Sequence, residues 1–152
     1  MSVQKKIDIK NKRAAFEFFL LQKFEAGIQL RGTEIKAIRE GMANLADAYC
    51  LFQQGRLIVK SLFISEYSQG SYYNHEARRD RILLLNKTEL KKIERKLTEK
   101  GHTLIPTRLY ITDRGFAKLE VALASGKKLY DKRNTIKEKD NRREEERLKN
   151  YR

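Results

Sequence analysis

Aromatic and basic side chains alternate between residues 65 and 81, and these residue types suit RNA binding. The stretch contains Tyr67, Tyr72, Tyr73, His75, Arg78, Arg79 and Arg81. Aromatic rings stack on unpaired bases, and guanidinium groups neutralise phosphates. A solvated loop whose tyrosines pack on the protein body would have the same composition. The pattern therefore suggests an RNA-binding loop and leaves the structural alternative open.

Residues that would support catalysis are scarce. His75 and His102, the two histidines, lie far apart in the sequence, and there is no metal-ligand spacing, glycine-rich phosphate loop or nucleophile motif. Glu34 and Asp47 are acidic, but carboxylates near helix starts and turns usually act as caps. Cys50 is the single cysteine, and we expect it to be a small buried hydrophobic residue. The sequence thus predicts no enzyme activity, no metal and no cofactor.

The charge of the chain predicts a polyanionic partner. The 152 residues include 34 Lys or Arg against 20 Asp or Glu, which gives a net charge of +14. Nucleic acid is the usual partner of such a chain, and a membrane surface is the competing polyanion. No apolar run approaches the ~20 residues that span a bilayer, and residues 1–13 are too polar for a signal peptide. We therefore expect a cytoplasmic protein without a membrane segment.

The last stretch, residues 126–152, differs from the rest in composition. It has 11 Lys or Arg against 6 Asp or Glu, and few sizeable apolar side chains. That apolar area is too small to offset an ordering entropy of roughly 1–2 kcal/mol per residue. We expect a basic tail that is disordered when free and ordered along a polyanion. The predicted organisation is a basic N-terminal segment (1–13), a body (14–125) and this tail.

Hydrophobic periodicity indicates that the body is mainly β. The even positions from Ala14 to Leu30 are apolar except for Gln22, which is strand periodicity, although a helix in the first part is an alternative. A strand this long must bend to stay on one core, and residues 22–23 and Gly27 are the expected places. Glu25, next to the second bend, is either an exposed strand carboxylate or an acceptor for base or ribose donors.

Further elements follow from local signals. We predict strands over 48–53, 56–64, 103–112 and 116–124, a hairpin at Gln54–Gly55, a short helix from 32 that stops at Gly41, and a capped helix over 86–100. Pro106 is expected at the start or edge of its strand. Five or six antiparallel strands with added helices indicate a small closed or partly open barrel, with the OB-fold as the natural candidate.

Several motifs, in order along nearly the whole chain, resemble one family. They are NKRAAFEF at 11–18, FEAGIQLRGTEIKAIREGMANLADAY at 24–49, NHEARRDRILLL at 74–85, GHTLIP at 101–106 and GKKLYDKRNTIKEKD at 126–140. The resemblance is to SmpB, the small protein that binds transfer-messenger RNA (tmRNA, or SsrA). The 24–49 and 126–140 blocks are specific when they occur together.

The resemblance implies an OB-like barrel with added helices and a C-terminal tail. It further implies binding to the tRNA-like domain of tmRNA and delivery of this RNA to stalled 70S ribosomes for trans-translation, with help from elongation factor Tu and GTP. The tail would enter the empty messenger channel near the decoding centre and become helical there. The protein would act as a single copy and catalyse no reaction. A general single-stranded RNA-binding or ribosome-associated barrel protein is the alternative.

The family motifs assign Asn11, Lys12, Arg13, Glu25, Leu84, Lys118 and most of the tail residues to the candidate site. The composition of residues 65–81 adds His75, Arg78, Arg79 and Arg81. Those expected to contact RNA are Asn11, Lys12, Arg13, Glu25, Lys36, Arg39, Asn44, Tyr49, His75, Arg78, Arg79, Arg81, Leu84 and Lys118. Those expected to act in the ribosome are Gly126, Lys127, Lys128, Tyr130, Asp131, Lys132, Arg133, Ile136 and Lys137. Leu84 lies in a run that the apolar pattern alone predicts to be buried, whereas the resemblance places it near RNA.

Three positions depart from the family pattern. Tyr130 stands where many members have His, and a phenol can stack on a base but cannot become a cation. Ala77 replaces the usual Pro, which loosens the loop. Ile82 replaces a usual Lys, which removes one potential phosphate contact.

Overall fold

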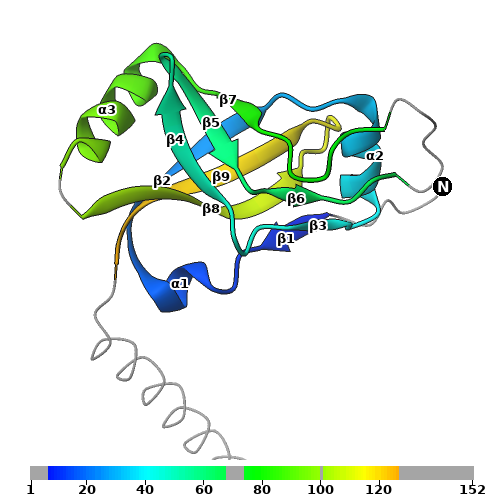
Figure 1. Cartoon of the computed structure of the whole chain (residues 1–152), viewed down its shortest axis with the longest axis horizontal. Coiled ribbons are helices and arrows are strands. Elements are labelled where there is room, and N and C mark those ends of the chain that lie inside the picture. Colours follow the sequence, from blue (N-terminus) through cyan, green and yellow to red (C-terminus); the bar gives the residue numbers. More distant parts are fainter. Residues whose placement is uncertain (1–6, 68–73, 100, 127–152) are drawn as a thin grey trace, which may run out of the picture.

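Strand pairing closes the chain into a ring. The computed structural model describes residues 7–67, 74–99 and 101–126. The main sheet consists of β1 (Asp8–Lys10), β2 (Phe18–Ile28), β4 (Tyr49–Gln53), β5 (Arg56–Lys60), β7 (Arg81–Leu84), β8 (His102–Ile111) and β9 (Ala117–Gly126). Its strand order is β1-β8-β4-β5-β7-β2-β9, and β8 also pairs with β9, so that the last six strands form a closed antiparallel barrel (Figure 1). The prediction of a mainly β, antiparallel barrel is confirmed.

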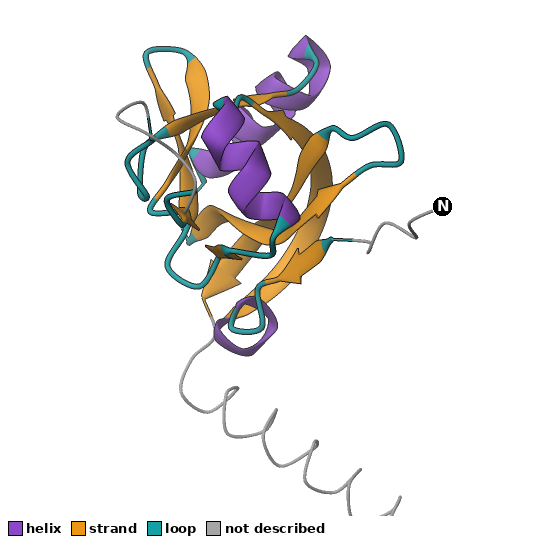
Figure 2. Cartoon of the chain, turned by 90° about the vertical axis from the view of Figure 1, so that its right-hand side faces the viewer, coloured by secondary structure: helices purple, strands orange, loops and turns teal. Residues whose placement is uncertain are grey.

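Three helices and a small sheet complete the described structure. Helices α2 (Gly32–Arg39) and α3 (Lys87–Leu97) lie at opposite ends of the barrel (Figures 1 and 2), and α1 (Ala14–Glu17) precedes β2. Strand β3 (Ala43–Asn44) pairs with β6 (Phe63–Ile64). Strand β1 pairs with β8, so the sheet includes residues that the sequence division assigned to the N-terminal segment.

The core fills the barrel and extends under both end helices. Buried aliphatic residues of β2, β5, β8 and β9 pack with Ala37 and Ile38 of α2 and with Ile93 of α3. Cys50 belongs to this core, and burial raises the pKa of its thiol well above the usual range. The expectation that Cys50 is a small buried hydrophobic residue is therefore confirmed.

A β-bulge divides β2 between two hydrophobic clusters. Leu20 pairs with Ala124 and Gln22 pairs with Leu123, so Leu21 is an extra residue. Because a one-residue shift exchanges the two faces of a strand, the even positions face the barrel core only after the bulge. Phe24 and Ala26 lie in that core, whereas Phe18 and Leu20 join Ala14, Ile105 and Ala124 in a second cluster. The bend falls next to the predicted position, but the assumption of one core and of a strand from Ala14 onward was wrong.

Pro106 lies inside β8, not at its start or edge as predicted. It is buried and pairs with Val121, directly before a bulge at Thr107. On the other side of β8, Leu104 pairs with Cys50 of β4 and Arg108 pairs with Lys10 of β1. Proline is tolerated here because the partner strand changes at this point and the ladder is already interrupted.

The locally encoded elements match their predictions. The side chain of Asn86 accepts a hydrogen bond of 2.9 Å from the Glu89 amide and caps α3, which ends at Leu97. Gln54 and Gly55 both have positive φ, as a two-residue hairpin of type I′ requires, and Gly41 ends α2 with φ of 75°. The strand predicted over 56–64 is interrupted at Ser61, which has φ of 60°.

Candidate RNA interface

Three candidate residues meet on the outer surface where β7, β2 and β9 run side by side. Gly27 of β2 pairs with Leu84 of β7 on one side and with Lys118 of β9 on the other. Glu25 lies two residues before Gly27, so its side chain shares the outer face of β2. Glu25 is exposed, and Leu84 is 52% exposed although it follows a buried leucine. Residues far apart in the sequence are thus brought together by strand register.

A groove of about 550 Å³ lies beside these residues. Its lining includes Gly27, Leu30, Ile35, Leu84, Phe116 and Lys118. Phe116 is 64% exposed, the largest exposure among the large hydrophobic residues of the described structure. An apolar groove with an aromatic ring and one ammonium group suits an unpaired nucleotide, because the ring can stack on a base while the cation meets a phosphate. We name this surface, with Glu25 at its border, the Leu84–Lys118 face.

Gly27 allows this arrangement. A Cβ atom built on Gly27 would lie 3.4 Å from the Cβ of Leu84, so any side chain larger than Ala would press on Leu84. Phe116 was not among the predicted site residues. The sequence signal that could have indicated it is its place directly after the turn Asp113-Arg114-Gly115. An aromatic ring next to a turn has few core residues to pack against.

A second group of predicted residues lies elsewhere on the barrel. The guanidinium groups of Arg13 and Arg78 each lie 3.9 Å from the Asp47 carboxylate, and all three side chains are more than half exposed. Arg78 also lies over the ring of Phe63, with 5.7 Å to its centroid. Asn44 and Tyr49, which flank Asp47 in the sequence, are exposed, as is Lys12. The ion pairs to Asp47 are exposed, and such pairs contribute at most about 1 kcal/mol to stability. The two arginines can therefore exchange Asp47 for another anion at little cost.

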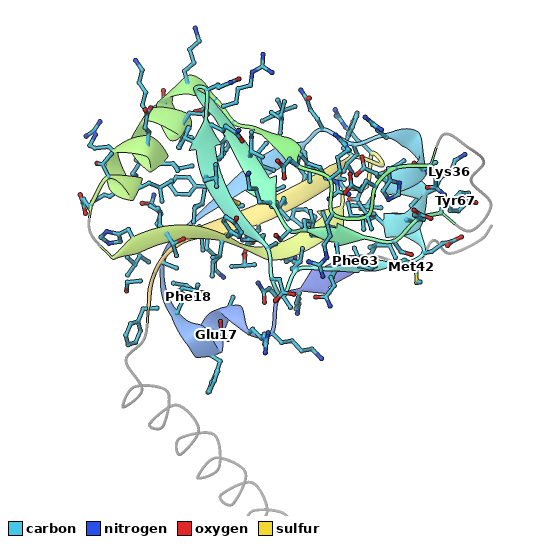
Figure 3. All side chains as sticks on the ribbon, viewed as in Figure 1. Glu17, Phe18, Lys36, Met42, Phe63 and Tyr67 are labelled. Atoms are coloured by element: carbon cyan, nitrogen blue, oxygen red, sulfur yellow. The ribbon has the colours of Figure 1, made fainter. Side chains whose placement is uncertain are left out.

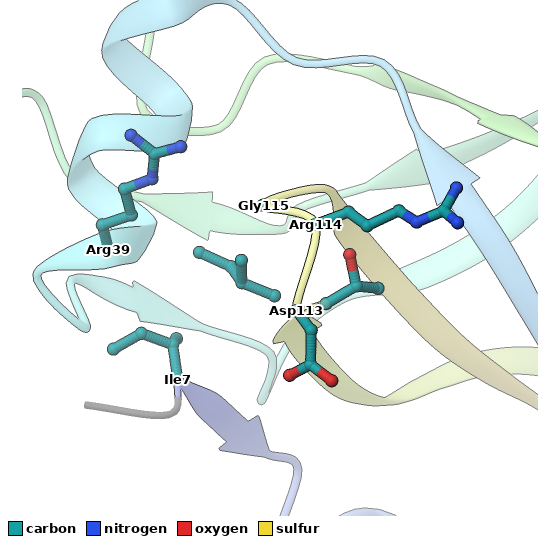
Figure 4. Close-up of a pocket in the computed structure, with 7 residues that line it drawn as sticks. Ile7, Arg39, Asp113, Arg114 and Gly115 are labelled. Atoms are coloured by element: carbon teal, nitrogen blue, oxygen red, sulfur yellow. The ribbon is translucent and has the colours of Figure 1, made fainter. Parts of the chain in front are cut away.

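Other predicted residues are engaged in the fold or line separate hollows. Asn11 donates from Nδ2 to the carbonyl of Pro106 at 2.9 Å and to that of Leu45 at 3.3 Å, which ties the start of the chain to β8. Lys36 lies over the ring of Tyr67 at 5.6 Å (Figure 3). Arg39 lines a hollow of about 460 Å³ with Ile7 and the β8–β9 turn, where Arg114 and Asp113 also lie (Figure 4).

His75 and Arg81 are buried, so this structure offers no exposed side chain for the RNA contacts predicted for them, and those contacts stay predictions. His75 is 1% exposed; its Nε2 donates to the Ile64 carbonyl at 2.9 Å, and its Nδ1 is hydrogen-bonded to the Thr33 hydroxyl at 2.8 Å. Arg81 has no exposed surface, and its Nη1 donates to the Leu62 carbonyl at 2.7 Å. In the interior, protein groups take the place of water as the hydrogen-bond partners of both side chains.

Arg81 belongs to a network centred on Glu34, whereas His75 contacts Thr33, the residue before Glu34 in α2. The Glu34 side chain has no exposed surface and accepts hydrogen bonds from Arg79, from Arg81 and from the Arg31 backbone amide. Burial alone would raise the pKa of this carboxyl, but the hydrogen bonds from Arg79, the Arg31 amide and Arg81 outweigh burial and leave the pKa lowered. The network ties residues 74–81 to α2. Arg79 is one-quarter exposed, and its proposed RNA contact stays a prediction.

The remaining predictions concern residues beyond this surface. Gly126 ends β9 and is exposed, whereas Lys127, Lys128, Tyr130, Asp131, Lys132, Arg133, Ile136 and Lys137 lie outside the described residues, as do Tyr72 and Tyr73. Among the residues that the structure describes, no cluster of three or more His, Cys, Asp or Glu side chains could hold a metal ion. None of the described helices is long and apolar enough to cross a membrane.

The closed antiparallel strands, the exposed cations and the apolar groove with its aromatic ring are together typical of small RNA-binding β-barrels. Comparison with known proteins narrows this class. A family model described as SmpB protein matches residues 8–151, and the chain belongs to the SmpB family.

Relatives with the same family assignment align with this chain over nearly its full length. The chain is 57% identical over 145 residues to the SsrA-binding protein of Bacteroides thetaiotaomicron, which covers 95% of this chain and 97% of that protein. It is 46% identical over 144 residues to the SsrA-binding protein of Moorella thermoacetica, covering 95% and 93%. A solved structure described as "tmRNA-SmpB: a journey to the center of the bacterial ribosome" matches with a TM-score of 0.69 and 41% identity, covering 81% of this chain and 86% of the other.

Proposed function

We propose that this chain binds the tRNA-like domain of tmRNA and delivers it to stalled ribosomes for trans-translation. Membership of the SmpB family and the match to a tmRNA–SmpB structure support this function. The observation that carries it is the strand register at Gly27, which places Glu25, Leu84 and Lys118 on one outer face. These are three of the residues that the motifs marked for RNA contact.

The Leu84–Lys118 face would recognise folded RNA by three kinds of contact. Lys118 neutralises a phosphate, the apolar wall of Leu84 and Phe116 covers an unstacked base or ribose, and Glu25 accepts from a base or 2′-hydroxyl donor. The cations of Lys12, Arg13 and Arg78, on a separate part of the barrel, would contact RNA phosphates, and Lys36, Arg39, Asn44 and Tyr49 are further candidate contacts. Residues 127–152 would follow the empty messenger channel, where their basic side chains meet ribosomal RNA.

Binding to tmRNA and to the ribosome also defines where the protein acts and with which other partners. The protein acts as a single copy on tmRNA, in the cytoplasm where ribosomes work, and elongation factor Tu with GTP helps to deliver the complex. It catalyses no reaction, because positioning an RNA requires binding surfaces rather than a reactive group. The ribosome supplies the peptide-transfer chemistry.

Replacing the central residues of the face tests this function. We expect Lys118→Ala to lower affinity for the tRNA-like domain and to reduce the salt slope of binding by roughly 0.7–0.9, the value for one phosphate contact. Leu84→Ala should cost roughly 1–2 kcal/mol, about tenfold in Kd, if the side chain is fully covered by RNA. Filter binding or fluorescence anisotropy at several salt concentrations measures both effects.

Matched controls exist for each variant. Leu21 is 54% exposed on the same strand as Gly27 but six residues away, so Leu21→Ala should leave affinity unchanged. Lys10→Ala removes an exposed strand lysine from β1. If the control variants weaken binding as much as the site variants, the Leu84–Lys118 face is not the RNA-binding surface.

A general single-stranded RNA-binding protein is the second candidate, and the exposed Phe116 ring favours it. Stacking on aromatic side chains is tolerant of base sequence. Competition between the tRNA-like domain, bulk tRNA and a random oligomer separates the two functions. Equal affinity for all three RNAs would support general binding and contradict the proposed function.

A further inference from the structure

The outer side of α3 carries three cations that neither candidate surface includes. Lys91, Lys92 and Arg95 are exposed, while Ile93 of the same helix is fully buried against the core. Their spacing places the three on one side of the helix, because positions three and four residues apart are neighbours. Figure 3 shows nitrogen-tipped side chains projecting from α3 away from the barrel.

These cations lack acidic partners within the described structure. No carboxylate of the described residues lies within 4.0 Å of their charged nitrogens. Near the end of α3, the Glu99 carboxylate lies 3.7 Å from the Lys96 ammonium and 3.5 Å from His102 Nδ1. Arg95 lies three and four residues from the two lysines, so like charges repel along this side of the helix. These three cations make no ion pair among the described residues, so their charges are available to a polyanion.

The surface on α3 lies away from Lys118 along β9, although α3 begins at Lys87, three residues after Leu84. The helix covers the barrel end where β8 begins and β9 ends (Figure 1), and His102 there pairs with Ser125. Ser125 is seven residues along β9 from Lys118, about 23 Å at ~3.3 Å per residue. Gly126, from which the C-terminal segment continues, lies at the α3 end.

We propose that Lys91, Lys92 and Arg95 bind the phosphate backbone of ribosomal RNA next to the point where the C-terminal segment leaves the barrel. The inference rests on the proposed function and adds a second RNA contact to it. Three cations without an aromatic ring or a side-chain amide between them suit phosphates, which position a protein, rather than bases, which specify sequence. Ribosomal RNA is the polyanion that the neighbouring C-terminal segment is proposed to meet.

A triple variant of the full-length chain tests the surface. Lys91→Gln/Lys92→Gln/Arg95→Gln removes three charges and retains good helix formers. A matched control, Lys10→Gln/Lys23→Gln/Arg114→Gln, removes three exposed cations from β1, β2 and the β8–β9 turn. Binding of each protein to small ribosomal subunits and to the isolated tRNA-like domain is measured from low to moderate salt, and thermal unfolding confirms that each variant is folded.

The expected result is specific to α3 and to the ribosome. The α3 triple should reduce the salt slope for small subunits by about 2 to 3, from roughly 0.7–0.9 per phosphate contact, and change affinity for the tRNA-like domain less than about twofold. An unchanged slope, or an equal change in the control triple, would overturn the inference. So would a loss confined to the tRNA-like domain, which would make α3 part of the tmRNA site. If the wild-type chain bound neither RNA, the proposed function itself would fail.

Discussion

A carboxylate without exposed surface is stable only when cations and donors replace the water it has lost, and Glu34 meets this condition. Arg79, Arg81 and the Arg31 amide occupy its two oxygens. Arg81 also holds the carbonyls of Leu62 and Ala77, so one buried pair fixes three segments of chain. The arginines of the 74–81 stretch therefore divide their roles: Arg81 holds the loop inside the protein and Arg78 points to solvent.

Replacing Glu34 by Gln should destabilise the protein strongly. Arg81 would be left as a buried charge without a counterion, and breaking such a pair costs roughly 3–5 kcal/mol. Chemical unfolding at pH 7 measures the loss. Glu40→Gln, at the exposed end of the same helix, should change stability by less than about 0.5 kcal/mol. Similar losses in the two variants would show that the Glu34 network is not what holds the loop.

The same residue should make stability depend on pH. The pKa of Glu34 is lowered in the folded protein, so its contribution is fully present above the unfolded value of about 4.3 and is lost as pH falls through the folded pKa. We expect the stability difference between wild type and Glu34→Gln to be constant near neutral pH and to shrink below about pH 4. A difference that persists unchanged at low pH would contradict the assigned charge state.

At the scale of elements, Gly27 shows how strand register builds the site. It is the residue of β2 that pairs with both Leu84 and Lys118, so the outer face at this point is formed by its neighbours. We expect Gly27→Val to displace Leu84 and weaken binding of the tRNA-like domain by about tenfold, a change of ~1.4 kcal/mol. Gly27→Ala, whose Cβ makes an ordinary contact of 3.4 Å, should bind nearly as well as wild type.

The two Gly27 variants also separate binding from folding. Gly27 lies on the outer face, so Val there requires no repacking of the core, and thermal unfolding should change little. If Gly27→Val unfolded the barrel, the Gly27→Ala protein would still report on the site through its affinity. Equal affinity for wild type and Gly27→Val would mean that the position of Leu84 is not critical for RNA binding.

Elements encoded by neighbouring residues were predictable from sequence, and those set by distant pairing were not. The cap at Asn86 and the Gln54–Gly55 hairpin depend on residues within four positions of one another, and both appear as expected. The bulge at Leu21 depends on how β9 pairs with β2, so periodicity alone missed the exchange of faces. Family motifs predicted RNA contacts for Glu25, Leu84 and Lys118, which strand register places on one face. Composition around His75 and Arg81 gave no sign that their partners lie in α2 and β6.

At the scale of the whole molecule, the positive charge is divided between the barrel with its helices and the C-terminal segment that follows Gly126 in the sequence. Residues 126–152 contain 11 of the 34 basic residues, and the rest of the chain keeps a net charge of +9. All residues of the Leu84–Lys118 face precede Gly126, which is the last residue of β9. We therefore expect truncation to separate the RNA-binding face from the C-terminal segment.

Deletion of residues 127–152 should separate the two tasks. The barrel retains its closed strand ring, so we expect the truncated protein to bind the tRNA-like domain within about tenfold of wild type, with the loss arising from phosphate contacts that disappear at high salt. Peptide tagging on ribosomes stalled at the end of a truncated message should be abolished, because nothing occupies the messenger channel. Lys132→Ala/Arg133→Ala in the full chain should impair tagging without changing tRNA-like-domain affinity. Tagging by the truncated protein at wild-type efficiency would refute a role for the C-terminal segment in the channel, while loss of tRNA-like-domain binding would refute the division of labour.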